Sequence, residues 1–310
     1  MATLSARSRV VSKEIQRERF PRGNLVYRLE SFVIYAAVTL FTAIVILPVI
    51  HVVARSFSPE AFIRAGQVIL WPVGFTFSAY KDIIQSDQFL TGLRNSVIIT
   101  GIATPLQMVF TTCGAYALSR PSMPGRKFLM YVIVIPMVFP PGLIPFYLTV
   151  RGLGLVDSYF ALIFPYAVNA FNLIVLRSFF QGLPVELEEA ALMDGANQWQ
   201  IMSRIYLPLA KPALATISLF YFVQNWNMYL PAVFFITNGS KEPLQPVLRD
   251  IIFSSQLAAS GALPGQWQQL AGAEGIKAAA VILTALPIFV IYPFLQKYFT
   301  KGLTLGAIKG

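Results

Sequence analysis

The densest group of reactive side chains is a set of carboxylates between Leu183 and Pro208. Four of the chain's 14 acidic residues fall within nine positions there: Glu186, Glu188, Glu189 and Asp194. Carboxylates can act as general acids and bases, but no nucleophile–base pair accompanies these, so the stretch does not form an active site. A single histidine, His51, also excludes a metal site with two histidine ligands in the chain. The chain is therefore not predicted to be an enzyme.

The elements expected to position these carboxylates are two short helices joined by a tight turn. Pro184 suits the start of the first helix, because its missing N–H would be unpaired there anyway, and carboxylates in the first turn complement the helix dipole. Gly195 falls where a helix C-cap is expected, and Asn197 can cap a second helix that ends at Pro208. Apolar residues at near-helical spacing predict one apolar face: Leu187, Ala190, Ala191 and Met193, then Trp199, Ile201, Met202 and Ile205.

Long uncharged runs dominate the rest of the chain and predict an all-α membrane protein. The chain is 56% hydrophobic and 12% charged, about half the charge of a soluble domain. Six runs without Asp, Glu, Lys or Arg are long enough to cross a bilayer, at about residues 31–54, 95–119, 128–150, 158–176, 212–236 and 278–296. Prolines inside the runs predict kinks or broken helices: Pro136, Pro140, Pro141, Pro145, Pro165 and Pro231.

The distribution of basic residues predicts that both termini lie in the cytoplasm. With the N-terminus inside, 16 of the 24 Lys and Arg fall on the cytoplasmic side and eight outside. This orientation explains the net charge of +10 without nucleic acid, and it places residues 183–208 in the cytoplasm between spans four and five. Residues 1–30 are expected to form a cytoplasmic tail, either solvated or folded as a membrane-surface helix, and not a cleaved signal. Residues 31–300 form the transmembrane domain, and residues 301–310 a C-terminal tail.

Two absences from the sequence indicate that a partner supplies energy. The spans lack ionisable residues, which argues against transport driven by protons or voltage. No Gly-x4-Gly-Lys-Ser/Thr pattern occurs, so the chain does not hold a nucleotide in a P-loop. The polar stretch 183–208, with its Ala-rich face and a stiff turn at Gly195, is predicted to dock a cytoplasmic protein. The alternative is an amphipathic hairpin that lies on the bilayer surface.

Polar residues inside the spans predict either a substrate pathway or contacts between helices. Amides and aromatic rings suit a sugar, which has hydroxyls to hydrogen-bond and an apolar ring face. Amides also join neighbouring helices in bilayers, and both interpretations stay open for Asn225 and Asn227, whereas helix contact is favoured for Asn169. The pathway candidates are Asn172, Tyr221, Gln224, Asn225, Trp226 and Asn227.

The stretch 183–208 resembles the signature loop of permease subunits of binding-protein-dependent ABC importers. That loop has Glu-Ala-Ala, then Gly after three residues, then Ile-x-Leu-Pro after nine more. Every spacing is kept here by Glu189, Ala190, Ala191, Gly195, Ile205, Leu207 and Pro208. Seven fixed positions match by chance at about one start in 10⁷. The likeness extends over nearly the whole chain, and runs such as LPLAKPALATISLFYFVQNWN resemble the maltose-type carbohydrate branch, above all permeases for oligosaccharides released from polysaccharides.

The resemblance implies a type I importer fold of six spans, with a cytoplasmic coupling helix between spans four and five. It implies a homologous permease partner (a related chain in preference to a second copy), an extracytoplasmic binding protein, and two ATPase subunits that bind ATP and Mg²⁺; this chain binds no cofactor. The imported oligosaccharide is neutral or uronate-containing, such as an alginate- or pectin-type fragment, and the membrane is the bacterial inner membrane. The implied ATPase-coupling residues are Glu186, Glu189, Ala190, Ala191, Asp194, Gly195, Ile205, Leu207 and Pro208. Residues 237–277 are expected to meet the binding protein, and residues 302–310 the ATPases.

Two other classes of protein remain as alternatives. A self-contained secondary transporter or channel is disfavoured by the charge-free spans and by the lack of an inverted repeat. A membrane scaffold would use residues 183–208 for docking alone.

Overall fold

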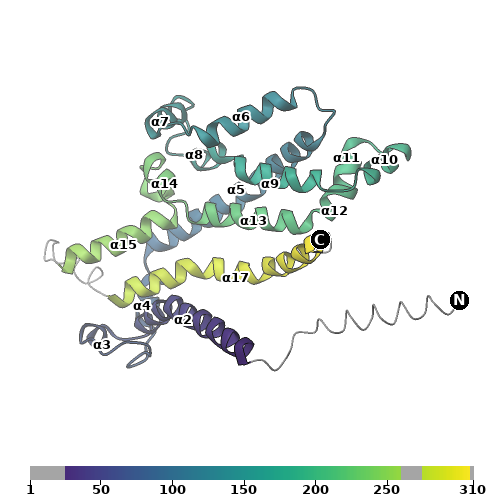
Figure 1. Cartoon of the computed structure of the whole chain (residues 1–310). Coiled ribbons are helices and arrows are strands. Elements are labelled where there is room, and N and C mark those ends of the chain that lie inside the picture. The colour runs from purple at the N-terminus through teal and green to yellow at the C-terminus, as the bar shows by residue number, and fades with distance from the viewer. Residues whose placement is uncertain (1–24, 260–273, 308–310) are drawn as a thin grey trace.

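The protein is described by a computed structural model over residues 25–259 and 274–307, with side chains described for residues 29–253 and 274–294. Every regular element in these ranges is a helix, as the hydrophobic runs predict. Figure 1 shows the long helices lying roughly side by side, with the short helices α10 and α11 projecting at one end. The predicted tails fall mostly outside this description, although α17 continues through residues 301–307.

The helices vary greatly in length. The longer ones are α2 (Leu25–Ser56), α5 (Asp87–Ser119), α6 (Arg126–Val138), α7 (Leu143–Gly152), α9 (Ala170–Gln181), α10 (Val185–Met193), α13 (Lys211–Trp226), α15 (Leu244–Ala259) and α17 (Glu274–Ala307). The short ones are α3 (Glu60–Arg64), α4 (Ser78–Ile84), α8 (Phe160–Ile163), η1 (Phe164–Tyr166), α11 (Gln198–Ile201), η2 (Met202–Tyr206), α12 (Leu207–Leu209), α14 (Leu230–Phe235) and η3 (Gly239–Lys241).

Three single helices in the described chain are long and apolar enough to cross a membrane. They are α2, α5 and the Glu274–Phe294 part of α17; the first two contain the predicted spans 31–54 and 95–119, and the third covers the predicted span 278–296 except for its last two residues. Two bent pairs of helices meet the same criterion, Phe160–Tyr166 with Ala170–Gln181, and Gln198–Leu209 with Lys211–Trp226. The described chain therefore has three to five candidate spans.

The remaining predicted run, 128–150, is not one continuous helix. It folds as α6 and α7, separated at residues 139–142. Pro140 and Pro141 lie in this break, where they donate no backbone hydrogen bond and restrict the residue before each of them. The run 212–236 is also broken, into α13 and α14, with Pro231 in the first turn of α14. The prolines thus divide these runs instead of only kinking them.

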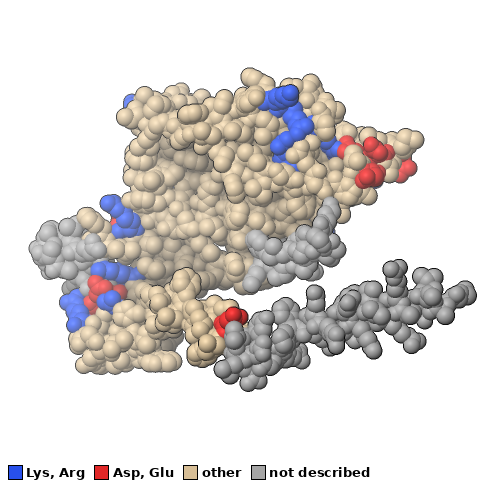
Figure 2. All heavy atoms as spheres, viewed as in Figure 1, with Lys and Arg blue, Asp and Glu red and all other residues tan. Residues whose placement is uncertain are grey.

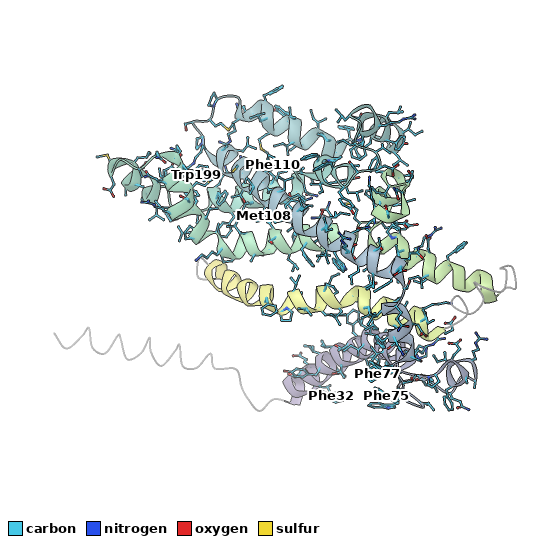
Figure 3. All side chains as sticks on the ribbon, turned by 180° about the vertical axis from the view of Figure 1, so that it is seen from behind. Phe32, Phe75, Phe77, Met108, Phe110 and Trp199 are labelled. Carbon is cyan, nitrogen blue, oxygen red and sulfur yellow. The ribbon has the colours of Figure 1, made fainter. Side chains whose placement is uncertain are left out.

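Helix α5 lies at the centre of the bundle. It packs against α9, α13 and α15, while α17 packs against α2 and α13. The side of α5 that meets these neighbours carries small and polar residues, among them Ala103, Gln107 and Thr111, all of which are fully buried. Small residues allow helices in a bilayer to approach closely, and polar ones bond across the contact. The outward surface is apolar instead, as Phe32 on α2 illustrates in Figure 3, where its side chain is 69% exposed.

Asp157 links two loops at the end of the bundle opposite to α10. Its backbone has a φ of 61°, in the left-handed region. Its carboxylate accepts hydrogen bonds from the Thr237 hydroxyl and from the backbone N–H groups of Thr237 and Asn238, while Lys241 Nζ donates to its carbonyl oxygen at 2.6 Å. The bonds from Thr237, followed by that from Asn238, lower the pKa of this carboxylate below its ordinary value. The loop after α7 is therefore tied to the segment that follows α14.

Candidate functional site

Residues 183–209, called the acidic hairpin below, fold as the predicted helix, turn and helix. Helix α10 begins directly after Pro184, and Gly195 adopts a φ of +79°, a conformation that favours glycine. Asn197 and Gln200 form a reciprocal capping box at the start of α11, with hydrogen bonds of 2.9 Å in each direction. The second helix runs to Leu209, one residue beyond the predicted end at Pro208, and is then bent by 83° into α13.

The two helices of the hairpin are buried very differently. Ile201, Met202 and Tyr206 from the second helix enter a core cluster with side chains of α5 and α9. Helix α10 has no buried residue, although Ala191 packs against the edge of that cluster. Met193 is 89% exposed and Trp199, labelled on the hairpin in Figure 3, is 67% exposed. The hairpin is therefore firmly anchored on one side and presents uncovered apolar side chains on the other.

An ion pair anchors α10 to the bundle. Arg120, directly after α5, pairs with Glu188, and their side chains are only 12% and 16% exposed. The Arg120 guanidinium lies against two aromatic rings that meet edge to face, 4.3 Å from the centre of Tyr116 and 4.5 Å from that of Tyr206. The Tyr206 hydroxyl also donates to Glu188 at 3.2 Å. Nε and Nη2 of Arg120 are buried without a hydrogen-bond acceptor. The cation–π contacts with the two rings stabilise the guanidinium in their place.

Sequence reasoning missed both members of this pair as site residues. The predicted coupling residues Glu186, Glu189 and Asp194 are exposed, and only Glu188 turns towards the bundle. The close spacing of the acids indicates a polar helix but not which of its carboxylates faces the protein. The available signal was Arg120, a basic residue at the end of an uncharged run, which the predicted orientation places on the same side of the membrane as the carboxylate-rich segment.

The amide of Asn225 lies in a hydrogen-bonded network between α5 and α13. Its Nδ2 donates to Gln107 Oε1 at 2.7 Å and to Thr104 at 3.0 Å, and Gln107 Nε2 donates back at 3.2 Å. Gln107 also donates to the carbonyl of Tyr166. Asn225 and Gln107 are both buried, so in this structure the Asn225 amide is used for contact between helices.

Three further pathway candidates also lie inside the protein. The Tyr221 hydroxyl is 2.6 Å from Thr111 Oγ1 and accepts from the Asn169 backbone N–H. Trp226 Nε1 donates to the carbonyl of Thr284 on α17 at 2.9 Å. Asn172 is 3% exposed, and its backbone N–H is capped by the Asn169 side chain. These residues join helices α5, α9, α13 and α17.

Gln224 and Asn227 are the exposed members of the predicted pathway. Asn227 lies at the end of α13, and its side-chain oxygen accepts from Gln245 on α15 at 3.2 Å. Gln245 belongs to a groove of about 410 Å³ lined by Tyr229, Gln245, Leu248, Arg249, Ile252 and Phe253. The groove thus combines an amide, an aromatic hydroxyl and a guanidinium that is 57% exposed. This is a chemistry suited to hydroxyl-rich ligands, including anionic ones.

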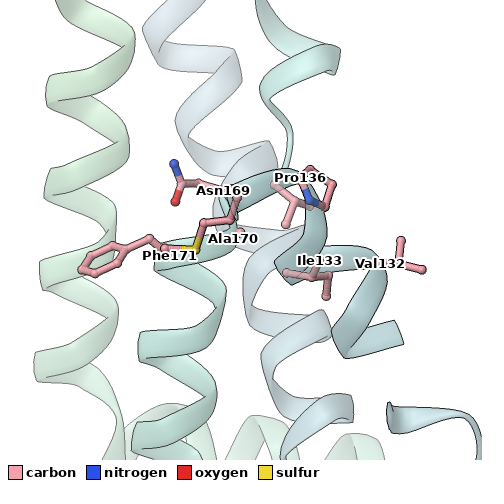
Figure 4. A pocket seen from close by; sticks show the side chains of 8 residues that line it. Val132, Ile133, Pro136, Asn169, Ala170 and Phe171 are labelled. Atoms are coloured by element: carbon pink, nitrogen blue, oxygen red, sulfur yellow. The ribbon is translucent and has the colours of Figure 1, made fainter. Parts of the chain in front are cut away.

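A second cleft, of about 470 Å³, lies between α6 and the start of α9. Figure 4 shows Val132, Ile133 and Pro136 on one side and Asn169, Ala170 and Phe171 on the other. Asn169 is the only side-chain amide among its lining residues, and its oxygen already caps α9. This cleft is mostly apolar, and it suits a sugar less well than the groove at Arg249.

No group of three or more His, Cys, Asp or Glu side chains is close enough to hold a metal ion in the described ranges. The acidic hairpin thus lies at one end of the molecule, and the groove with its amide, aromatic and guanidinium groups lies on α15 at the other (Figure 1).

The chain matches known proteins over most of its length. Residues 110–305 match the profile of the family described as binding-protein-dependent transport system inner membrane component. The polygalacturonan/rhamnogalacturonan transport system permease protein of Bacillus subtilis is 41% identical over 288 residues, covering 91% of this chain and 99% of the relative. The trehalose transport system permease protein of Mycobacterium tuberculosis is 32% identical over 276 residues, with 88% and 95% covered. A solved bacterial ABC transporter involved in the import of the acidic polysaccharide alginate has a chain that is 34% identical, with 90% and 99% covered and a TM-score of 0.83.

Proposed function

Because this chain belongs to the family of binding-protein-dependent transport system inner membrane components, we propose that it is the permease subunit of an ATP-driven ABC importer for an oligosaccharide. Both relatives are named for sugar transport, and the solved structure is named for the import of a polysaccharide. The proposed arrangement has six spans in the bacterial inner membrane and both termini in the cytoplasm, supported by the excess of Lys and Arg on that side.

The acidic hairpin is the proposed coupling element, and its exposed outer side is the observation that carries this assignment. Met193 and Trp199 project from an element whose other side is locked into the bundle. Exposed apolar side chains of this size at the tip of a polar hairpin are typical of a protein interface. An ATPase that grips this surface would move the hairpin, and the Arg120–Glu188 pair would carry the movement directly to α5.

The power source is proposed to be a pair of ATPase subunits that hold ATP and Mg²⁺, because the sequence lacks a P-loop of its own. A homologous permease, a related chain in preference to a second copy, would complete the pathway. An extracytoplasmic binding protein would deliver the sugar. This chain itself is proposed to bind no cofactor and to catalyse no reaction.

The substrate is proposed to contact Gln224 and Asn227 and the groove that contains Tyr229, Gln245 and Arg249. These side chains are exposed or line the groove, whereas Tyr221, Asn225 and Trp226 are buried and form hydrogen bonds between helices. Among the described residues, the ion pair of the Arg249 guanidinium is with Asp250 at 3.6 Å, and this long contact leaves the guanidinium able to bind another carboxylate. A uronate-containing oligosaccharide would supply one, in keeping with the acidic polysaccharide in the name of the solved relative.

The function is tested by reconstituting the chain with its partner permease, ATPases and binding protein in sealed vesicles. Uptake of labelled oligosaccharide should require ATP and continue when an uncoupler abolishes the proton gradient. Uptake that collapses with the uncoupler while ATP is held constant would instead identify a secondary transporter. A failure to accelerate ATP hydrolysis by any ATPase partner would favour a scaffold.

The substrate class is tested with Arg249→Gln in the same vesicles. Uptake of a uronate oligomer should fall about tenfold while uptake of a neutral oligomer changes little, because a charge-assisted hydrogen bond is lost only with the acid. Arg151→Gln, a change at another exposed arginine, is the matched control. Equal loss with both sugars would remove Arg249 from substrate selection.

A further inference from the structure

A third pocket lies at the same end of the molecule as the acidic hairpin, outside the coupling and substrate sites. It has a volume of about 690 Å³ and is lined by Pro121, Met123, Gly125, Arg126, Lys127, Met130, Tyr131 and Arg177. Three of these residues are cationic. Figure 2 shows Lys and Arg atoms gathered near the start of α6, beside the acidic residues of the hairpin.

The cations of this pocket are not neutralised by the protein. Arg126, Lys127 and Arg177 form no ion pair in the described chain; the nearby Glu188 is already paired with Arg120. With its amide oxygen turned towards them, Gln181 accepts from Arg126 at 2.8 Å and from Arg177 at 3.2 Å. A neutral amide thus holds two guanidinium groups close together. Arg126 and Lys127 also occupy the first turn of α6, where the helix dipole disfavours positive charge. A bound anion would neutralise these cations and would remove the unfavourable interaction between their charge and the dipole of α6.

The apolar surroundings of the pocket indicate what kind of anion fits. Helix α6 has no buried residue, and its outward side chains next to the pocket are apolar or aromatic: Phe128 is 69% exposed and Tyr131 is 65% exposed. Met123 and Met130 line the pocket itself. A soluble anion would gain nothing from this surface, whereas an acyl chain would cover it. A tyrosine at such a boundary is typical of the membrane–water interface.

We propose that this pocket binds the headgroup of an acidic phospholipid from the cytoplasmic leaflet. The phosphate would lie among Arg126, Lys127 and Arg177, and an acyl chain would run along α6 past Tyr131. The inference rests on the orientation given under the proposed function, which puts this end of the bundle at the cytoplasmic membrane surface. The lipid would then lie next to Arg120 and the hairpin, so that it would stiffen the base on which α10 moves. Basic pockets between spanning helices on this side of a membrane bind such headgroups in other proteins.

The test compares the assembled importer with its Arg126→Gln, Lys127→Gln double variant. Arg177 is left intact because its Nε donates to the carbonyl of Leu118 at the end of α5. Lys211→Gln, which removes an exposed charge from the same end outside the pocket, is the matched control.

Each purified complex is titrated with phosphatidylglycerol, and the retained lipid is counted by native mass spectrometry. The double variant should bind phosphatidylglycerol about 30-fold more weakly, because each basic residue near an acidic lipid surface contributes about a factor of five. The control should bind as the parent does.

Activity separates this inference from the proposed function. In phosphatidylcholine vesicles all three complexes should import oligosaccharide at the same rate, and one-third phosphatidylglycerol should stimulate only the parent and the control. Equal retention of phosphatidylglycerol by the parent and the double variant would overturn the lipid site, as would displacement of the lipid by millimolar glycerol phosphate. Loss of the ATPase subunits from the double variant in every lipid would identify the pocket as a protein interface instead. Absence of ATP-driven uptake by the parent in every vesicle would refute the proposed function, while the binding measurement would still decide the lipid site.

Discussion

Arg120 and Glu188 form a nearly buried ion pair that joins the end of α5 to α10, two elements far apart in sequence. The rings of Tyr116 and Tyr206, which meet edge to face, both contact the guanidinium. Because α5 is also the helix against which α9, α13 and α15 pack, this pair connects α10 to the centre of the bundle, and under the proposed function it would help to pass a displacement of α10 to that centre.

Removal of one partner of the pair is expected to destabilise the protein strongly. Glu188→Ala leaves the Arg120 charge buried and unpaired, at a cost of about 3–5 kcal/mol. The measurement is the unfolding temperature and the denaturant midpoint of the purified complex. Glu186→Ala, which changes an exposed carboxylate on the same helix, should shift stability by about 0.5 kcal/mol or less. The Arg120→Met, Glu188→Met double variant should recover part of the loss, since no lone charge remains. Additive losses in the double variant would show that the two residues act independently.

Gly195→Asp is expected to separate ATP hydrolysis from transport without preventing membrane insertion. The left-handed backbone at φ +79° costs a non-glycine residue about 1–2 kcal/mol, although a Cβ atom there meets no heavy atom within 4 Å. The strain therefore falls on the turn that sets the angle between α10 and α11. Coupled uptake and ATPase rates in reconstituted vesicles test this, with Glu189→Lys as a second variant on the exposed face. Normal uptake by both variants would remove the coupling assignment.

Asn225 and Asn227 are expected to respond differently to substitution by alanine. Asn225→Ala leaves Gln107 and Thr104 without their partner in a buried site, which should lower stability by about 1–3 kcal/mol. Asn227→Ala removes an exposed amide and should reduce uptake while stability and basal ATPase activity stay near those of the parent. Thermal unfolding in detergent and uptake in vesicles distinguish the two effects. A thermally stable Asn225→Ala protein with reduced uptake would instead place Asn225 in the substrate pathway.

Asp157 is expected to make part of the stability dependent on acid pH. Its hydrogen bonds lower its pKa in the folded protein below the ordinary value of 3.8. The stabilisation is therefore present above that ordinary value and is lost as pH falls through the lower folded pKa. Asp157→Asn keeps the shape but removes the charge. The unfolding temperature of the parent should exceed that of the variant at about pH 6, and the difference should shrink towards about pH 3. A difference that stays constant over this range would exclude ionisation of Asp157 as its cause.

Local sequence signals predicted the acidic hairpin well. Pro184, Gly195 and Asn197 act on their own backbone or on that of the next turn, so their effect can be read without knowing what surrounds them. The same locality explains why the hydrophobic runs predicted helices. Pro140 and Pro141 predicted either a kink or a break, without deciding between them. A proline shows where a helix hydrogen bond is missing but not how far the chain turns afterwards.

By itself, the sequence determined that this is a helical membrane chain with a polar helical hairpin, and motif spacing led to its family. Only the tertiary structure decided which polar residues face inward. Glu188 and not Glu186 meets Arg120, and Asn225 and not Asn227 enters the bundle. The basic pocket likewise forms only where the start of α6 meets the end of α9. Neighbouring polar residues on one helix differ by the rotation of that helix about its axis, and this rotation is set by packing against partners remote in sequence.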